Sequence, residues 1–169
     1  SGAHATVGGG DTNTASSAYS TVGGGFSNNA SGAVATIGGG DGNGASGSRG
    51  TVSGGQGNTA SGQFSTVSGG YQAVASRYGQ YAHASGRFIS NGDVQYSRYI
   101  VRTATTDATA NVELFLDGTA GSNRITIPQD TAFSFHIYIC SIEQTGNNAK
   151  SSEIVGLIRR QNGGNATII

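Results

Sequence analysis

The side chains that could perform catalysis or bind a metal are few, and they lie far apart in this sequence. Its 169 residues include three histidines, His4, His83 and His136, and one cysteine, Cys140. A hydrolase or transferase needs a nucleophile beside its base, or two carboxylates at a defined spacing. None of the histidines stands beside an acidic residue or cysteine at the spacing of a metal site. We therefore expect no catalytic residue, no bound metal and no cofactor.

Glycine-rich repeats can form phosphate-binding loops or calcium sites, but the residues around these glycines argue against both. Gly-Gly-Gly runs begin at Gly8, Gly23 and Gly38, but neither a Lys-Ser/Thr pair nor a helix signal follows, as a phosphate-binding loop requires. Asp follows these glycines only at Asp11 and Asp41, so a repeated carboxylate cage for calcium is not expected. We interpret the glycines as corners of the chain with positive φ.

Charge and composition exclude several classes of partner. The chain has nine basic and nine acidic residues, so its formal net charge is zero, and there is no electrostatic reason to expect nucleic acid or an anionic membrane. We find no apolar run near the ~18 residues of a membrane span and no signal-peptide pattern, so we expect neither. A single cysteine excludes an intrachain disulfide.

The glycines belong to a 15-residue repeat that fills residues 1–75 five times without a gap. Positions one, six, nine, ten and fifteen are Ser, Thr, Gly, Gly and Ala in every copy. Position seven is always Val or Ile, and position thirteen is Asn in four copies, which predicts a ladder of turn-forming asparagines. A flexible linker does not require a β-branched residue at the same position of every repeat. A solenoid does, because equivalent residues of successive coils stack on one another. Residues 1–75 are therefore predicted to form ordered coils.

Each coil has room for two short strands and two tight turns, which predicts a narrow parallel β-roll. The glycine pair Gly9-Gly10 and its equivalents should form positive-φ corners. Two positions per coil should point inward: Val7, Val22, Ile37, Val52 and Val67, with Ala15, Ala30, Ala45, Ala60 and Ala75. Ordering a coil costs about 20 kcal/mol, and burying one Val and one Ala returns only about 3 to 4 kcal/mol. We therefore expect the Val/Ile stripe to form the core of a homotrimer.

The repeat has the form A-S-G-x-x-[SA]-T-[VI]-[GS]-G-G-x-x-N-x and resembles the head repeat of trimeric YadA-like (Hep/Hag) adhesins, which is also found in bacteriophage tail fibres. The resemblance covers Ser1 to about Phe88, with residues 76–86 as a shortened last copy. It implies left-handed parallel β-rolls packed as trimers. The family repeat is typically one residue shorter, and we find no heptad stalk or anchor barrel after it, which favours a phage fibre.

Residues 91–169 differ in composition and are predicted to form an antiparallel β domain after the YadA-like roll of residues 1–90. Strands are expected at residues 97–103, 111–116, 124–127, 132–143, 153–160 and 166–169. In the longest, one face is predicted to be core and consists of Phe133, Phe135, Ile137 and Ile139; the other face is amphipathic. The fold class is thus all-β, a trimeric β-roll followed by a β-sandwich-like or jelly-roll domain that is either truncated or completed by another chain. Residues 92–99 and 112–118 also resemble modules of phage tail-fibre proteins.

Outward positions are free to differ between copies, and positions four and eleven do. Both positions mark the expected outer face. Position four is occupied by His4, Tyr19, Val34, Arg49 and Phe64. Position eleven is occupied by Asp11, Phe26, Asp41, Gln56 and Tyr71. Mixed aromatic and polar groups on a rigid surface suit contact with a glycan or a protein. The ligand-binding residues that we expect near the junction are Phe64, Tyr71, Arg77, Tyr78 and Tyr81. The alternative is that they only cover coil edges.

The predicted function is that of a non-enzymatic structural and receptor-binding segment of a trimeric bacteriophage tail fibre, located in the virion. Its partners would be two further copies of the chain and a glycan or protein receptor on the host cell surface. One alternative is the head fragment of a bacterial trimeric autotransporter adhesin at the extracellular cell surface. Another is a polysaccharide-degrading tailspike, which would need paired carboxylates in a groove. The repeated threonines at position six are a normal strand choice, with an ice-binding array as the alternative reading.

Overall fold

The computed structural model describes residues 2–102, 114–118, 125, 131–142, 149–160 and 167–168. Every regular element in these ranges is a β-strand. The chain divides into two compact units, residues 1–125 and 126–169. The boundary expected near residue 90 stays a prediction. The strands expected at residues 111–116 and 124–127 fall largely outside the described residues.

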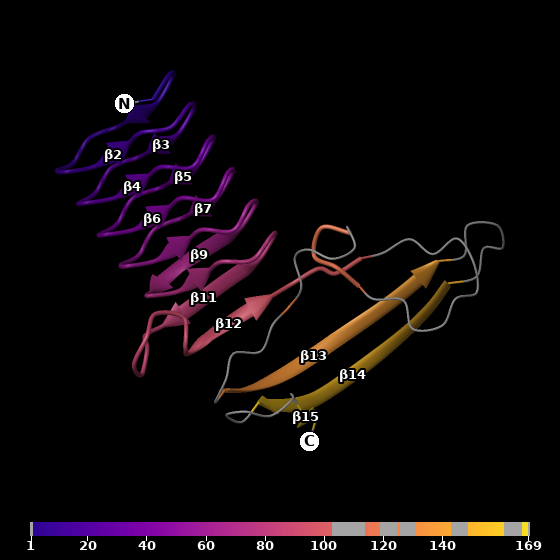
Figure 1. Ribbon diagram of the computed structural model, residues 1–169. Coiled ribbons are helices and arrows are strands. Elements are labelled where there is room, and N and C mark those ends of the chain that lie inside the picture. Colours follow the sequence, from indigo (N-terminus) through magenta and orange to yellow (C-terminus); the bar gives the residue numbers. More distant parts are fainter. Residues whose placement is uncertain are drawn as a thin grey trace. The chain divides into compact units, whose positions relative to one another are not determined.

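The first unit contains a parallel β-roll of stacked 15-residue coils, as predicted (Figure 1). Each coil contributes one strand at repeat positions six and seven and another at positions fourteen and fifteen. The first set is β1 (Thr6–Val7), β3 (Thr21–Val22), β5 (Thr36–Ile37), β7 (Thr51–Val52) and β9 (Thr66–Tyr71). The second set is β2 (Thr14–Ala15), β4 (Asn29–Ala30), β6 (Gly44–Ala45), β8 (Thr59–Ala60) and β10 (Val74–Ala75). Each strand pairs in parallel with its equivalent 15 residues later, so like residues stack on like.

Two further strands complete the first sheet at its C-terminal end. β11 (Tyr81–Ser85) continues the sheet parallel to β9, and β12 (Gln95–Arg98) then pairs antiparallel with β11. The strand expected at residues 97–103 therefore begins two residues earlier and ends at Arg98. Its bounds follow from the register with β11, in which Tyr81 lies opposite Arg98 and Ala84 opposite Gln95.

Backbone hydrogen bonds join each coil to the next at fixed repeat positions. The N–H of Thr6 donates forward to the carbonyl of Ser20 at 2.9 Å, and equivalent bonds recur along the roll. At positions four and twelve the direction reverses: the N–H of Tyr19 donates back to the Ala3 carbonyl at 2.9 Å. These corner residues have positive φ, for example +57° at Tyr19 and +53° at Ser27. The left-handed backbone turns the N–H toward the preceding coil while the chain passes from one sheet to the other.

The glycine corners are confirmed at position ten and only partly at position nine. All five position-ten glycines have φ between +82° and +95°. A Cβ on Gly40 would lie 2.1 Å from the carbonyl oxygen of Gly55, so both φ and close approach require glycine there. At position nine only Gly9 and Gly69 have positive φ. A Cβ at this position would meet no atom closer than 3.8 Å.

The predicted inward residues line the interior of the roll within a single chain. Val22, Ile37, Val52, Val67 and the position-fifteen alanines are buried, whereas Val7 on the edge strand β1 is 44% exposed. The four buried Val/Ile residues have no surface left to offer another chain. The homotrimer stays a prediction, and any contact between chains has to use residues other than these four. Position five, which sequence reasoning missed, is also inward; Ser20, Ala35 and Ser65 are fully buried there.

The asparagines of position thirteen form the predicted turn ladder. Asn28 Nδ2 donates to the carbonyl of Gly24 at 3.0 Å in its own coil and to that of Gly40 at 2.9 Å in the next. Its Oδ1 accepts the N–H of Asn43 at 3.0 Å. The pattern ends where Ala73 replaces Asn, with the Ala73 N–H bound to Oδ1 of Asn58 at 2.8 Å.

A side-chain amide closes the second sheet at its last coil. Gln95 Nε2 donates to the carbonyl of Val74 at 2.8 Å, and Gln95 Oε1 accepts the Val74 N–H at 2.8 Å. Gln80 Oε1 accepts the N–H groups of Ser76 at 2.9 Å and Arg77 at 3.0 Å. The Gln95 amide thus satisfies the backbone groups that a further strand would have paired with.

The second unit contains one antiparallel sheet in the order β13-β14-β15, built from β13 (Thr131–Ile142), β14 (Ala149–Arg160) and β15 (Thr167–Ile168). β14 begins four residues before the expected 153–160. Phe135, Ile137 and Ile139 alternate along β13 opposite Gly156, Ile154 and Ser152, as the two-residue period predicts. Its described residues confirm an antiparallel β region, and they form one three-stranded sheet; the sandwich stays a prediction.

An asparagine of the ladder should contribute more to the free energy of unfolding inside the roll than at its end. Asn43→Ala removes three hydrogen bonds that the buried Asn43 side chain makes, to the carbonyls of Gly39 and Gly55 and from the N–H of Asn58. We expect the free energy of unfolding to fall by about 3 kcal/mol. Asn13→Ala is the matched control in a half-exposed end coil, where water replaces the lost bonds, and should cost about 1 kcal/mol. Urea unfolding followed by circular dichroism measures both, and equal losses would contradict the ladder.

Ser65 and Ser20 share repeat position five and should respond to alanine in opposite directions. Ser65 Oγ is buried with no hydrogen-bond partner among the described residues. Ser65→Ala should therefore raise the free energy of unfolding by up to about 1 kcal/mol. Ser20 Oγ donates to the Ser17 carbonyl at 2.7 Å, so Ser20→Ala should lower it by about 1 kcal/mol. Thermal unfolding of the two variants tests this, and destabilisation by both would show that Ser65 has a partner.

Candidate functional site

A line of exposed side chains follows one edge of the roll at repeat position four. We call His4, Tyr19, Val34, Arg49 and Phe64 the corner stripe. Their φ angles lie between +57° and +60°, in the left-handed region. A Cβ in this region costs about 1 to 2 kcal/mol, and glycine would avoid the cost. Five successive coils nevertheless carry a side chain here, one of them β-branched.

Neighbouring members of the corner stripe stack on one another. The rings of His4 and Tyr19 lie 4.9 Å apart at an interplanar angle of 13°. The guanidinium of Arg49 lies 5.4 Å from the centre of the Phe64 ring, and Phe64 meets Tyr78 edge-on at 5.4 Å. Adjacent strands are about 4.8 Å apart, so coil stacking itself brings these side chains together. Tyr19 is still 59% exposed and Phe64 43%, so part of each ring stays accessible to a ligand.

Position eleven lies on the opposite edge, where the chain passes from the first sheet to the second. Its residues Asp11, Phe26, Asp41, Gln56 and Tyr71 form a line of parallel bridges. Gln56 Nε2 donates to Asp41 Oδ2 at 2.8 Å. The expected outer face is therefore two separate edges. One carries aromatic and basic groups, and the other carries aromatic and acidic groups.

The five residues expected to bind ligand do not gather in one cluster. Phe64 and Tyr78 contact each other at the corner stripe, and Tyr71 lies on the opposite edge. Tyr81 belongs to β11 and pairs with the ring of Tyr96 at 6.5 Å. Arg77 is exposed beyond β10. Burial raises the pKa of the Tyr99 phenol, and the positive charge of Arg77 partly opposes that rise. That these residues bind ligand stays a prediction.

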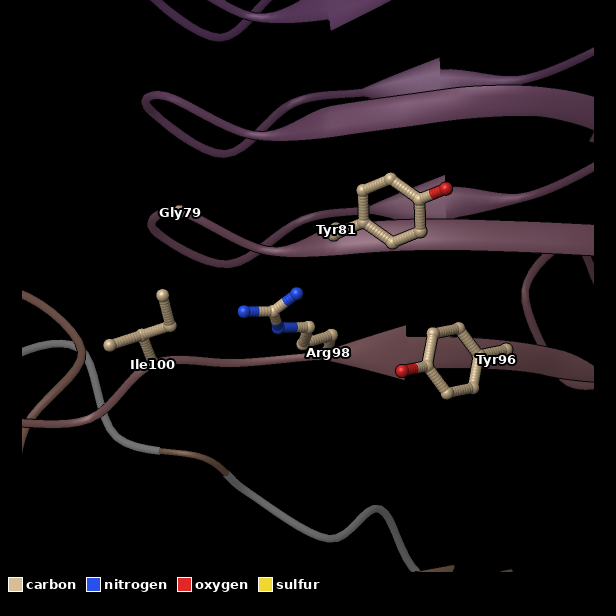
Figure 2. Close-up of a pocket in the computed structure, with 5 residues that line it drawn as sticks. All are labelled: Gly79, Tyr81, Tyr96, Arg98 and Ile100. Atoms are coloured by element: carbon tan, nitrogen blue, oxygen red, sulfur yellow. The ribbon is translucent and has the colours of Figure 1, made fainter. Parts of the chain in front are cut away.

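A surface pocket of about 440 Å³ lies at the C-terminal end of the first sheet (Figure 2). It is lined by Gly79, Tyr81, Tyr96, Arg98 and Ile100. Figure 2 shows the guanidinium of Arg98 between Tyr81 and Ile100, with Tyr96 on the same strand as Arg98. Two phenol rings and a guanidinium can contact a polar ring or an anion. Sequence reasoning found Tyr81 but missed Tyr96 and Arg98, whose signal is their alternation along β12.

The carboxylate of Asp93 binds three successive backbone N–H groups in the loop after β11. Asp93 accepts the backbone N–H groups of Phe88 at 3.0 Å, Ile89 at 2.7 Å and Ser90 at 2.9 Å. These hydrogen bonds, that from Ser90 above all, lower the pKa of the Asp93 carboxyl below its ordinary 3.8. The ordered loop presents the side chains of Phe88 and Ile89, which are 87% and 86% exposed.

The described part of the chain offers little other chemistry. No group of three or more His, Cys, Asp or Glu side chains there could hold a metal ion. His136 and Glu153 contact each other across β13 and β14. No helix within the described ranges is long and apolar enough to span a bilayer.

Comparison with known proteins gives one match, and it falls inside the roll. The family model described as Ubiquitous surface protein adhesin repeat matches residues 20–32. These residues include β3, the corner that follows it, and β4. Searches of curated proteins and of solved structures give no significant match.

The Asp93 carboxylate should make the loop pH-dependent. Because its pKa is lower in the folded chain, the stabilisation is complete above the unfolded value of about 3.8 and is lost as pH falls through the lower folded value. NMR titration of the Phe88, Ile89 and Ser90 amides should give a common midpoint below 3.8. Asp93→Asn should abolish the transition, and Asp41→Asn, on another edge, should leave it unchanged. A midpoint at or above 3.8 would contradict this role of Asp93.

Proposed function

We propose that this chain, an adhesin-like repeat protein with a YadA-like repeat region, is the structural and receptor-binding segment of a homotrimeric fibre that attaches to a cell surface. The β-roll supplies a stiff, regularly spaced scaffold. The side chains at its edges supply the contacts, and the receptor is a glycan or a protein. No step of the proposed attachment changes a covalent bond, so the segment is non-enzymatic.

The observation that supports attachment most directly is the corner stripe. Stacking of coils needs only a left-handed backbone at position four, and glycine provides it at Gly79, where φ is +61°. In the other five coils this position carries a side chain despite the strain of the left-handed backbone, and the side chain is an aromatic, basic or aliphatic group exposed to solvent. Costly backbone positions with exposed side chains are typical of binding sites. Aromatic faces and a guanidinium are the groups that contact sugar rings and their acidic substituents.

Multivalency would give such a fibre its strength. Each copy offers a shallow edge, which binds weakly because little surface is buried. Three rigidly linked copies raise the effective concentration of the second and third contact, so avidity exceeds single-site affinity by about 10² to 10⁴.

We assign the fibre to a bacteriophage tail and thus to the virion, because residues 92–99 and 112–118 resemble tail-fibre modules. The alternative is the head of a bacterial trimeric autotransporter adhesin at the outer cell surface, and the adhesin repeat match supports that setting. Antibodies to the chain would label virions by electron microscopy in the first case and bacterial surfaces in the second.

Substitution by glycine separates binding from folding. Tyr19→Gly with Phe64→Gly removes two ring faces and relieves two left-handed corners. Relief of about 1 to 2 kcal/mol per site offsets the entropic cost of glycine, about 0.5 to 1 kcal/mol. The melting temperature should stay the same or rise, while binding of the labelled protein to a panel of bacterial cells and surface glycans should fall at least about tenfold.

Ser27→Gly is the matched control, because it relieves a left-handed corner on the opposite edge. It should leave binding unchanged. Unaltered binding by the Tyr19/Phe64 variant would exclude the corner stripe as the contact. A wild-type protein that binds no cell or glycan in the panel would contradict the attachment function. Release of reducing ends from a bacterial capsule would show an enzyme instead.

A further inference from the structure

The outward face of the first sheet changes character at its last two strands. From the first coil to the fifth it carries Thr at repeat position six and Gly or Ser two residues later. On β11 the equivalent residues are Tyr81, which pairs with Thr66, and His83. On β12, Tyr96 lies opposite His83, and Arg98 lies opposite Tyr81. Four large polar or aromatic side chains therefore replace the small ones of the coils.

Two hollows lie on this face and share the ring of Tyr96. The first is the pocket of about 440 Å³ that contains Arg98 (Figure 2). The second, of about 310 Å³, is lined by His83, Ala84, Ser85, Val94, Gln95 and Tyr96. Both volumes lie in the lower part of the range of about 300 to 1,000 Å³ for small-molecule sites. Side chains two residues apart lie about 6.8 Å apart along a strand, so a ligand that fills both hollows must be a short chain of rings.

Gly79 leaves one side of the first hollow open. It occupies repeat position four in the closing copy, where the five preceding coils carry a side chain. Its φ of +61° and the hydrogen bond from its N–H to the Gln63 carbonyl, 2.9 Å long, are those of the other coils. A Cβ at Gly79 would meet no atom within 4 Å. The backbone of this corner is therefore unchanged, and only the side chain that would occupy the space beside the hollow is missing.

The charge of the first hollow comes from Arg98. Among the residues that the structure describes, none forms a hydrogen bond or an ion pair with its guanidinium. By contrast, Arg87 donates to Asn91 Oδ1 at 2.7 Å, and Arg102 donates to the carbonyl of Asp117 at 3.2 Å. No Asp or Glu of the described chain lines either hollow. A guanidinium with free N–H groups matches a carboxylate, which it can bind through two parallel hydrogen bonds.

The groups around Arg98 suit a sugar ring better than a bare anion. Tyr96 is 63% exposed and Ile100 65%, so an aromatic and an aliphatic surface flank the guanidinium. Aromatic rings present an apolar face together with a phenol hydroxyl that forms hydrogen bonds. A neutral sugar would use these surfaces and leave the guanidinium without a partner, whereas a small anion would leave the rings unused. A sugar that bears a carboxylate uses both.

We propose that these two hollows bind an acidic oligosaccharide. The carboxylate of one sugar residue binds Arg98 while its ring lies against Tyr96, and the next sugar residue occupies the second hollow beside His83. This site goes beyond the proposed function, whose contacts lie on the corner stripe, and it does not depend on the association of three chains.

Carboxylated glycans and their reduced forms test the ligand class. The panel contains tetrasaccharides with galacturonic, glucuronic or N-acetylneuraminic acid, each paired with the same glycan after its carboxyl groups are reduced to alcohols. In NMR titrations of the full chain, at least one acidic form should bind at least about tenfold more tightly than its reduced partner. Its binding should shift the signals of Tyr96 and Arg98. Inorganic phosphate should not compete at the same concentration.

Two arginine variants locate the charge that reads the carboxylate. Arg98→Gln should abolish the preference for the acidic form. Arg49→Gln removes the same charge from the corner stripe and should leave the preference within about twofold of wild type. Both arginines are exposed, so the melting temperature should not change.

A glycine variant tests the hollow without changing a charge. Gly79→Phe should weaken binding of the acidic tetrasaccharide at least about tenfold, because the ring would occupy the open side of the hollow. Gly42→Phe is the matched control on the opposite edge of the roll. Its φ is +62°, and a Cβ there also meets no atom within 4 Å. It carries the same backbone strain and should leave binding unchanged.

The second hollow is tested by ligand length. His83→Ala should weaken binding of the acidic tetrasaccharide but not of the corresponding acidic monosaccharide. An equal effect on both ligands, or none, would contradict the assignment of a sugar residue to this hollow.

The outcomes separate this inference from the proposed function. The inference fails if no acidic glycan is preferred, if Arg49→Gln abolishes the preference, or if phosphate competes equally well. Binding of the wild type to cells would in each case still support attachment. A chain that prefers an acidic glycan through Arg98 but binds no cell would support the inference and contradict the attachment function.

Discussion

Hydrogen bonds between coils are the interaction on which the roll depends. Its interior is thin: each inner coil buries a Val or Ile, an Ala and a small residue at position five. Backbone bonds of 2.8 to 3.3 Å join successive coils, and the Asn amides add bonds of the same kind at one corner. Such bonds are directional, so a coil of another length shifts the pairing register, as it does at β11, where Ala82 pairs with Val67 but Ala84 pairs with Gly70. This explains why the period stays at 15 residues through five copies.

The same constraint leaves the outer surface free to differ. Because the same backbone bonds recur in every coil, the side chains at positions four and eleven are free to differ from coil to coil. They form two edges of different charge, with Arg49 and His4 on one and Asp11 and Asp41 on the other. A rigid roll holds such groups about 4.8 Å apart from coil to coil. Association of three chains would multiply those edges.

Much of the fold followed from the sequence because the repeat has one period and one phase. The inward Val and Ala positions, the Asn ladder and the position-ten glycine all follow from a 15-residue coil with two strands. The site was harder to predict. Phe64 and Tyr71 are close in the sequence, but they occupy repeat positions four and eleven, about half a coil apart, so the coil places them on opposite edges. Tyr96 and Arg98 were missed because pairing with β11 sets the start of β12 at Gln95, two residues before the expected start of the strand.

Hydrogen exchange measured coil by coil tests the central role of these bonds most directly. The amides of positions six, eight and fourteen donate to the next coil from the first coil through the fourth, and Thr66 donates to the closing copy. In the native protein these amides should exchange slowly. Their protection from exchange should be similar in all inner coils and lower only in the first coil. Exchange at the rate of an unstructured peptide at any of these amides between residues 20 and 67 would contradict the account.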